Sequence, residues 1–133
     1  MNTKHNNKKV GNLGEELACR FLMKHDFRVL DRNYLKKCGE IDIIALKYNR
    51  IRFIEVKSVS CETLPELEAV NIDFRPEDNV HPWKLQRLVK TIQLYLSEKD
   101  VSPETDWQID IITVYIDKIR LISRVCILEN IIQ

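Results

Sequence analysis

The sequence is short of the features that most directly indicate a partner or a compartment. Lysine and arginine number 21 against 20 acids, which gives a net charge of +1, so no overall field indicates a nucleic-acid partner and any basic surface must be local. No apolar run approaches the roughly 18 residues that a membrane span needs. The N-terminus has no apolar segment typical of secretion. We therefore expect a cytoplasmic protein without a membrane partner.

The cysteines show no metal-binding or disulfide pattern. They are scattered along the chain, and no CxxC pair occurs among Cys19, Cys38, Cys61 and Cys126. Such spacing is typical of reduced intracellular thiols, some of them in the core, rather than of a zinc knuckle.

The length and composition fit one globular domain. The 133 residues are 44% hydrophobic and 31% charged, which is enough apolar material to bury a core. Residues 1–9 are polar and basic without periodicity, and they predict a flexible, solvated tail whose lysines could reach phosphates. The domain is expected over residues 10–133.

Hydrophobic periodicity predicts an α/β domain with the element order αβββαββ. Helices are expected over residues 12–25 and 82–97, and strands over 27–34, 40–46, 51–58, 109–116 and 119–125. The last two strands form a hairpin with its turn at Asp117-Lys118. Residues 60–80 are expected to be an irregular excursion with one helical turn at 64–70.

The stretch GEIDIIALKYNRIRFIEVK reads as a hairpin that carries charges where a dry sheet is expected. A turn centred on Tyr48-Asn49 places Asp42 opposite Glu55, and side-chain alternation puts Lys57 on the same face as Glu55. Two opposed carboxylates repel each other, and burial adds several kcal/mol to the penalty. Lys57 can neutralise one of them only.

A divalent cation can neutralise both carboxylates. Mg²⁺, or Mn²⁺, prefers one or two carboxylates, a backbone carbonyl and several waters, so Asp42, Glu55 and the Val56 carbonyl are candidate ligands. The helical wheel places Glu15 at the edge of the apolar face, as a third acid, and points Glu16 to solvent. Such a site activates water for attack on phosphorus, with Lys57 stabilising the transition state.

Each of these residues also has a purely structural explanation. A cross-strand salt bridge would account for Glu55 and Lys57, and Asp42 could lie in water at a sheet edge. The joint occurrence of Gly-Glu-Ile-Asp, a short turn and Glu-Val-Lys favours the site.

Several segments together resemble a known family. Asp42, then twelve intervening residues, then Glu55-Val56-Lys57 is similar to the PD-(D/E)xK nuclease signature. The fuller set resembles the YraN family of bacterial proteins, which is itself similar to archaeal Holliday-junction resolvases. The segments that carry the resemblance are GNLGEELA (11–18), a strand ending in RNY, GEIDIIA (39–45), FIEVK (53–57), Lys84, and Tyr95-Leu96 in the later helix.

The resemblance implies a restriction-endonuclease-like fold, with a central mixed β-sheet flanked by helices, and Mg²⁺-dependent cleavage of phosphodiester bonds. It implies catalytic roles for Glu15, Asp42, Glu55 and Lys57. It also implies a homodimer, because resolvases cut two strands symmetrically.

Nucleic-acid contacts are expected from basic residues near the site: Lys84, Arg87, Lys90, Lys36, Lys37 and Arg32. A solvated basic face is an equally strong interpretation of them. Trp83 could stack on a base, but for an aromatic residue at the start of a helix we expect packing on the core.

The leading hypothesis is therefore a metal-dependent nuclease acting on DNA, with branched or single-stranded DNA as candidate substrates. The alternative is a catalytically inactive protein of the same fold that binds nucleic acid or a protein partner. RNA processing is a third, weaker hypothesis. Metal binding separates the enzyme from the inactive protein.

Overall fold

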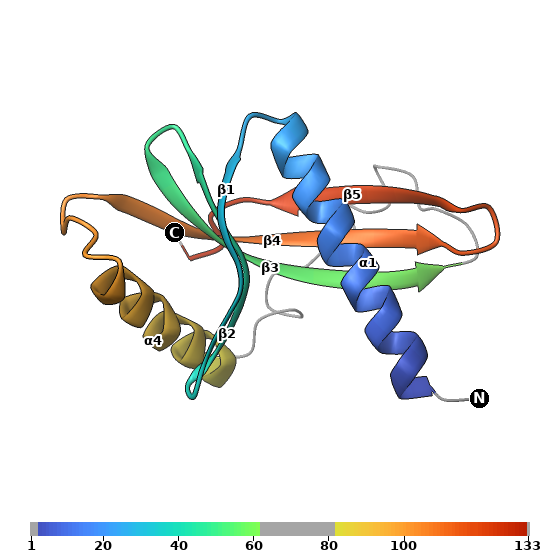
Figure 1. Ribbon diagram of the computed structural model, residues 1–133, viewed down its shortest axis with the longest axis horizontal. Helices are drawn as coiled ribbons and strands as arrows, with labels where there is room; N and C mark the ends of the chain where they lie inside the picture. The colour runs from blue at the N-terminus through green and yellow to red at the C-terminus, as the bar shows by residue number, and fades with distance from the viewer. Residues whose placement is uncertain (1–2, 62–81, 133) are drawn as a thin grey trace.

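The protein is described here by a computed structural model that covers residues 3–61 and 82–132 (Figure 1). The irregular excursion expected over residues 60–80, with its helical turn at 64–70, falls almost entirely on residues 62–81. That segment lies outside the described ranges.

The described elements follow the expected order αβββαββ. They are α1 (Thr3–Lys24), β1 (Arg28–Lys36), β2 (Gly39–Lys47), β3 (Arg50–Cys61), α4 (Pro82–Glu98), β4 (Asp106–Asp117) and β5 (Ile122–Leu128). The strands form one five-stranded sheet in the order β1-β2-β3-β4-β5. Strands β3 and β4 are parallel, and the other neighbours are antiparallel. The α/β class, the mixed sheet and the element order are thus confirmed.

The two helices pack on opposite faces of the sheet (Figure 1). On the α1 face, buried Ala18 and Leu22 pack with Ile54 and other residues of the sheet. On the α4 face, Ile92 and Tyr95 pack with residues that include Phe53. Because side chains alternate along β3, Ile54 and Phe53 serve different cores.

The β2–β3 hairpin forms with the predicted register. Lys47 pairs with Arg50 across a two-residue turn, and the turn residues Tyr48 and Asn49 both have positive φ, at 53° and 58°. Two central residues with positive φ define the type I′ turn whose twist matches a hairpin.

The pairing of β2 with β3 stops before Asp42. The last pair is Ile43 with Ile54, and the Asp42 carboxylate then accepts a hydrogen bond from the Val56 N–H at 2.8 Å. The expectation that Asp42 and Glu55 form a direct cross-strand pair is therefore wrong. The Asp42 side-chain oxygen accepts a hydrogen bond that a backbone carbonyl of β2 would accept in a regular ladder. The two strands separate at this point.

Two element boundaries differ clearly from the sequence-based expectation. Helix α1 begins at Thr3, so residues 3–9, which were expected in a tail, are helical. In the β4–β5 connection, the Asp117 carboxylate accepts the N–H groups of Ile119 and Arg120, each at 3.0 Å. This local side-chain bonding favours a turn, so β5 begins at Ile122 rather than at Ile119.

Candidate functional site

Asp42 occupies the point where β2 leaves β3. It is half-buried, and one carboxylate oxygen is held by the Val56 N–H. Burial raises the pKa of Asp42 to about 7 from an ordinary 3.8, although the Val56 hydrogen bond opposes the rise. The negative charges of three neighbouring carboxylates raise this pKa further: Glu15, Glu40 and Glu55. Three acidic side chains therefore surround Asp42 and raise its pKa.

Glu15 reaches this cluster because α1 lies unusually close to β3. A Cβ atom on Gly14 would fall 1.8 Å from the Ser58 hydroxyl oxygen, so only glycine allows the helix backbone to approach here. Burial raises the pKa of Glu15, and the charge of Glu40 raises it further, while a hydrogen bond with Asp42 is among the opposing effects. The structure thus brings Glu15 and Asp42 together.

Glu16 lies outside the cluster. Its carboxylate binds Arg32 at 3.1 Å and Arg20 at 3.4 Å, and hydrogen bonding to Arg32 lowers its pKa. The helical wheel had separated Glu15 from Glu16 in the same way. Glu16 is half-exposed and pairs with β1 through Arg32 rather than pointing entirely into solvent.

Glu40 and Asn33 were missed by the sequence reasoning. Asn33 has a positive φ of 52°. With its amide nitrogen facing the acids, it donates to Glu15 at 3.0 Å and to Glu40 at 3.2 Å. A signal for Glu40 was present, because it stands two residues before Asp42 in a strand. Asn33 gave no such signal, since its contact depends on a left-handed residue within β1.

Glu55 and Lys84 form an ion pair between β3 and α4. The Glu55 side chain is 22% exposed and that of Lys84 is 49% exposed. Lys57 is exposed and lines a shallow hollow of about 340 Å³ together with these two residues. The positive charge nearest Glu55 therefore comes from the helix, which the sequence could not show.

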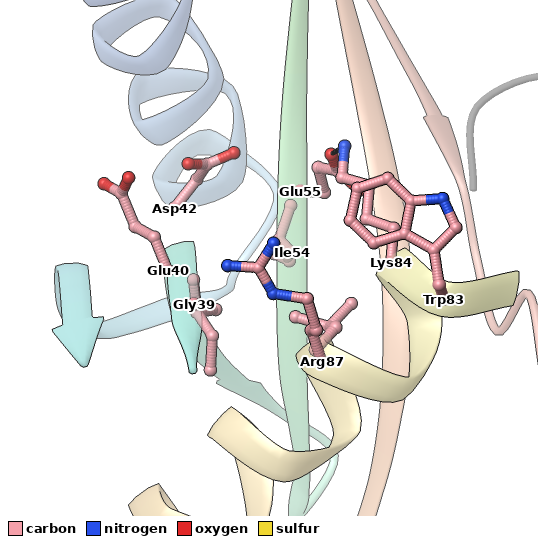
Figure 2. A pocket seen from close by; sticks show the side chains of 10 residues that line it. Gly39, Glu40, Asp42, Ile54, Glu55, Trp83, Lys84 and Arg87 are labelled. Atoms are coloured by element: carbon pink, nitrogen blue, oxygen red, sulfur yellow. Dashed lines mark hydrogen bonds and ion pairs between the residues drawn. The ribbon is translucent and has the colours of Figure 1, made fainter. Parts of the chain in front are cut away.

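A second hollow, of about 320 Å³, lies between β2, β3 and α4 (Figure 2). Its acids are Glu40, Asp42 and Glu55, and its bases are Lys84 and Arg87. The remaining lining residues are Gly39, Ile41, Ile54, Trp83 and Leu88. Acidic, basic and apolar groups thus share one small cavity.

The other basic residues named from the sequence are dispersed. Lys36 pairs with Glu98 at 2.9 Å, and Lys37 is exposed at the β1–β2 turn. Lys90 lines a separate hollow beside Cys38. Of the six predicted phosphate-contacting residues, only Lys84 and Arg87 line the acidic cavity.

Trp83 does not pack into the core, contrary to the sequence-based expectation. Its side chain is 55% exposed, and the Arg87 guanidinium lies 5.8 Å from the centre of its ring. Figure 2 shows Trp83, Lys84 and Arg87 projecting together from the first turns of α4. Pro82 begins the helix, so Trp83 precedes the stripe that contacts the sheet.

The donor chemistry of the cluster fits a hard divalent cation, since carboxylate oxygens from α1, β2 and β3 meet there and repel one another. As these side chains stand, however, no group of three or more His, Cys, Asp or Glu residues within 3–61 and 82–132 is arranged to hold a metal ion. The ion pair with Lys84 holds Glu55 on the α4 side. Metal binding would therefore require the carboxylates to turn toward one another.

The thiols and the helices add two further findings. All four cysteines are free, as the spacing predicted. In the part of the chain that the structure describes, no helix is both long enough and apolar enough to cross a membrane.

The fold and cavity define an α/β protein with a five-stranded mixed sheet and an acidic cluster where two strands separate. Comparison with known sequences identifies the family, because the sequence model of the uncharacterised protein family UPF0102 matches residues 14–114. The chain belongs to this family.

Curated relatives cover almost the whole chain. A UPF0102 protein of Helicobacter pylori (strain HPAG1) is 40% identical over 125 residues, which is 94% of this chain and 96% of the relative. A UPF0102 protein of Campylobacter jejuni (strain 81-176) is 36% identical over 115 residues, 86% of this chain and 91% of the relative.

Proposed function

We propose that this protein is a metal-dependent nuclease of the PD-(D/E)xK type that hydrolyses phosphodiester bonds in DNA. The observation that carries the proposal is the gathering of Glu15, Asp42 and Glu55, from three different elements, with Lys57 and Lys84 beside them. Folding this much like charge together is unfavourable in itself, which favours a functional rather than a structural role.

The donor set fits Mg²⁺ or Mn²⁺, with Asp42, Glu55, Glu15 and the Val56 carbonyl as the groups that would hold it. When bound, such a cation supplies charge screening and a more acidic water for attack on phosphorus. The resemblance to the YraN family and to resolvases supports the same assignment, and it also supports a homodimer.

The remaining roles belong to the side chains of the protein. The Lys84 ammonium group pairs with Glu55, and Lys57 lines the same hollow. Both lysines can stabilise negative charge that develops on a phosphate there. Arg87 donates its Nε–H to the Cys38 carbonyl at 3.1 Å, which fixes the direction of its guanidinium. The anchored guanidinium can then orient a phosphate at the rim of the cavity.

The test is a cleavage panel in Mg²⁺ and in Mn²⁺ on four-way junctions, flaps, single strands, duplex DNA and RNA. We expect cleavage of at least one DNA by the wild type, and loss of it in Asp42→Asn, Glu55→Gln and Lys57→Met. Glu15→Gln should also lose the cleavage. Its matched control is Glu16→Gln, which should keep the cleavage, because the two acids are adjacent but only Glu15 enters the cluster. Equal activity of wild type and cluster variants on every substrate would refute the proposal.

A second candidate function is a catalytically inactive protein of this fold that binds nucleic acid or a protein partner. The ion pair of Lys84 with Glu55 favours it, because it partly neutralises the site without a cation. Calorimetric titration with Mg²⁺ and Mn²⁺ separates the two. A nuclease should bind a cation, and Asp42→Asn and Glu55→Gln should abolish that binding. The inactive protein should bind no cation.

A further inference from the structure

The cavity contains an apolar wall that cleavage of a phosphodiester does not by itself require. Its accessible apolar surface comes from Trp83 and from half-buried Leu88, while Ile41 and Ile54, which also line the cavity, are buried beneath it. Phosphate recognition needs positive charge and hydrogen-bond donors, which Lys84 and Arg87 already provide. The apolar wall therefore indicates that part of the ligand in this cavity is itself apolar.

The position of Trp83 points to the nature of that apolar part. The indole is 55% exposed although α4 buries other aromatic and aliphatic side chains against the sheet, such as Tyr95 and Ile92. Arg87 lies 5.8 Å from the indole ring centre, and its Nε–H is held by the Cys38 carbonyl at 3.1 Å. A flat aromatic ring and an anchored guanidinium at one cavity mouth form the kind of platform on which nucleic-acid bases stack.

The base that uses this platform must be unpaired. Within a duplex, both faces of a base are covered by its neighbours, so a protein ring can reach a base face only after unstacking or at a single-stranded nucleotide. The cavity volume of about 320 Å³ is at the lower end for ligand pockets, so it suits one nucleotide rather than a duplex segment.

We propose that Trp83, supported by Arg87, stacks on an unpaired nucleobase and so makes this site selective for single-stranded nucleic acid or for junctions with an unpaired nucleotide. The inference rests on the proposed nuclease function and deepens it by naming the substrate class. The stacked base lies against the apolar wall. Its phosphate then lies toward Lys84, which is on the same side of the cavity as Trp83 (Figure 2).

The test measures binding in EDTA, where a metal-dependent nuclease does not cut. The probes are a twelve-nucleotide oligothymidylate, a blunt duplex hairpin, the same hairpin with one unpaired thymidine, and that hairpin with an abasic analogue in place of the thymidine. The variants are Trp83→Leu and Trp83→Phe. Gln86→Leu is the control, since Gln86 is an exposed residue of α4 outside the cavity lining.

Stacking of one base is worth about 1–3 kcal/mol, so we expect Trp83→Leu to weaken binding of oligothymidylate about 5- to 150-fold. Binding of the blunt hairpin should stay unchanged, Trp83→Phe should retain part of the affinity, and Gln86→Leu should match the wild type. In Trp107→Phe, which leaves Trp83 as the single tryptophan, oligothymidylate should quench the fluorescence. The abasic hairpin should not.

Equal losses on single-stranded and duplex probes, or no loss in Trp83→Leu, would overturn the inference, as would wild-type binding that does not distinguish thymidine from the abasic analogue. The cleavage panel keeps the two proposals apart. If DNA is cut but Trp83→Leu weakens binding of single-stranded and duplex probes equally, only the inference fails. If nothing is cut but Trp83→Leu weakens binding of the single-stranded probe alone, only the nuclease assignment fails. If the wild type binds none of the probes, the inference is overturned directly.

Discussion

Replacing Asp42 by asparagine should stabilise the folded protein at neutral and alkaline pH when divalent cations are absent. Burial and the neighbouring acids raise the pKa of Asp42 to about 7 from an ordinary 3.8. At about 1.4 kcal/mol for each pKa unit, keeping this carboxylate ionised in the folded state opposes folding by roughly 4 kcal/mol at most. Asparagine removes the charge, and its side-chain oxygen can still accept the Val56 N–H.

The pH dependence has a definite sign. Below about pH 4 the group is protonated in both states, so the charge has no effect on stability. Between about pH 4 and pH 7 the unfolded chain loses its proton while folded Asp42 keeps it, so wild-type stability falls as the pH rises. The gain from Asp42→Asn should therefore be small at pH 4, grow across this window and level off above pH 7.

Urea unfolding at pH 4, 6 and 8 in EDTA measures this gain. With a slope of about 2 kcal/mol per molar urea, within the usual range for small proteins, a gain of about 2–4 kcal/mol at pH 8 moves the midpoint by about 1–2 M. Asp106→Asn is the matched control, because the Asp106 side chain is 75% exposed and should give little change at any pH. A gain independent of pH, or a loss of stability at pH 8, would refute the electrostatic reasoning.

Three further variants test separate parts of the structure. Lys84→Met should raise the affinity for Mg²⁺ by up to about fivefold, because the Lys84 ammonium group competes with the cation for Glu55 and an exposed ion pair is worth about 0–1 kcal/mol. Weaker Mg²⁺ binding of the variant in calorimetry would contradict this competition. Gly14→Ala should lower the free energy of unfolding by about 1–3 kcal/mol through the clash with Ser58, and adding Ser58→Gly should recover part of the loss in urea unfolding. Tyr48→Asn should add roughly 1 kcal/mol, because asparagine tolerates the positive φ of this turn position better than tyrosine, and an unchanged urea midpoint would argue against strain there.

The sequence was sufficient where local rules decide the structure. A two-residue turn fixes the register of a hairpin, so the pairing of β2 with β3 up to Ile43 and Ile54 followed from the position of Tyr48-Asn49. Helical periodicity likewise separated Glu15 from its neighbour Glu16. Both inferences needed only the spacing of residues along one element.

The sequence was insufficient where a contact depends on several elements at once. Nothing local indicates that the Asp42 carboxylate takes over a ladder hydrogen bond from Val56, and this bond ends the regular pairing. The ion pair of Lys84 with Glu55 joins residues 29 positions apart, through a helix whose placement only the fold determines. The exposure of Trp83 was mispredicted for the same reason, since a helix-start aromatic residue can face either the core or a cavity.

The separation of β2 from β3 explains how both helices can serve one site although they lie on opposite faces of the sheet. A continuous ladder would keep the α1 face and the α4 face apart. Where the ladder ends at Asp42, a carboxylate interacts with Glu15 of α1 and also lines the cavity that contains Lys84 of α4. The raised pKa of Asp42 follows from this arrangement, because a group between two layers loses water on both sides while keeping acidic neighbours. The separation of the strands at Asp42 thus has two consequences. It makes the site unfavourable without a cation, and it lets acids from one face meet the bases and Trp83 from the other face around a single ligand.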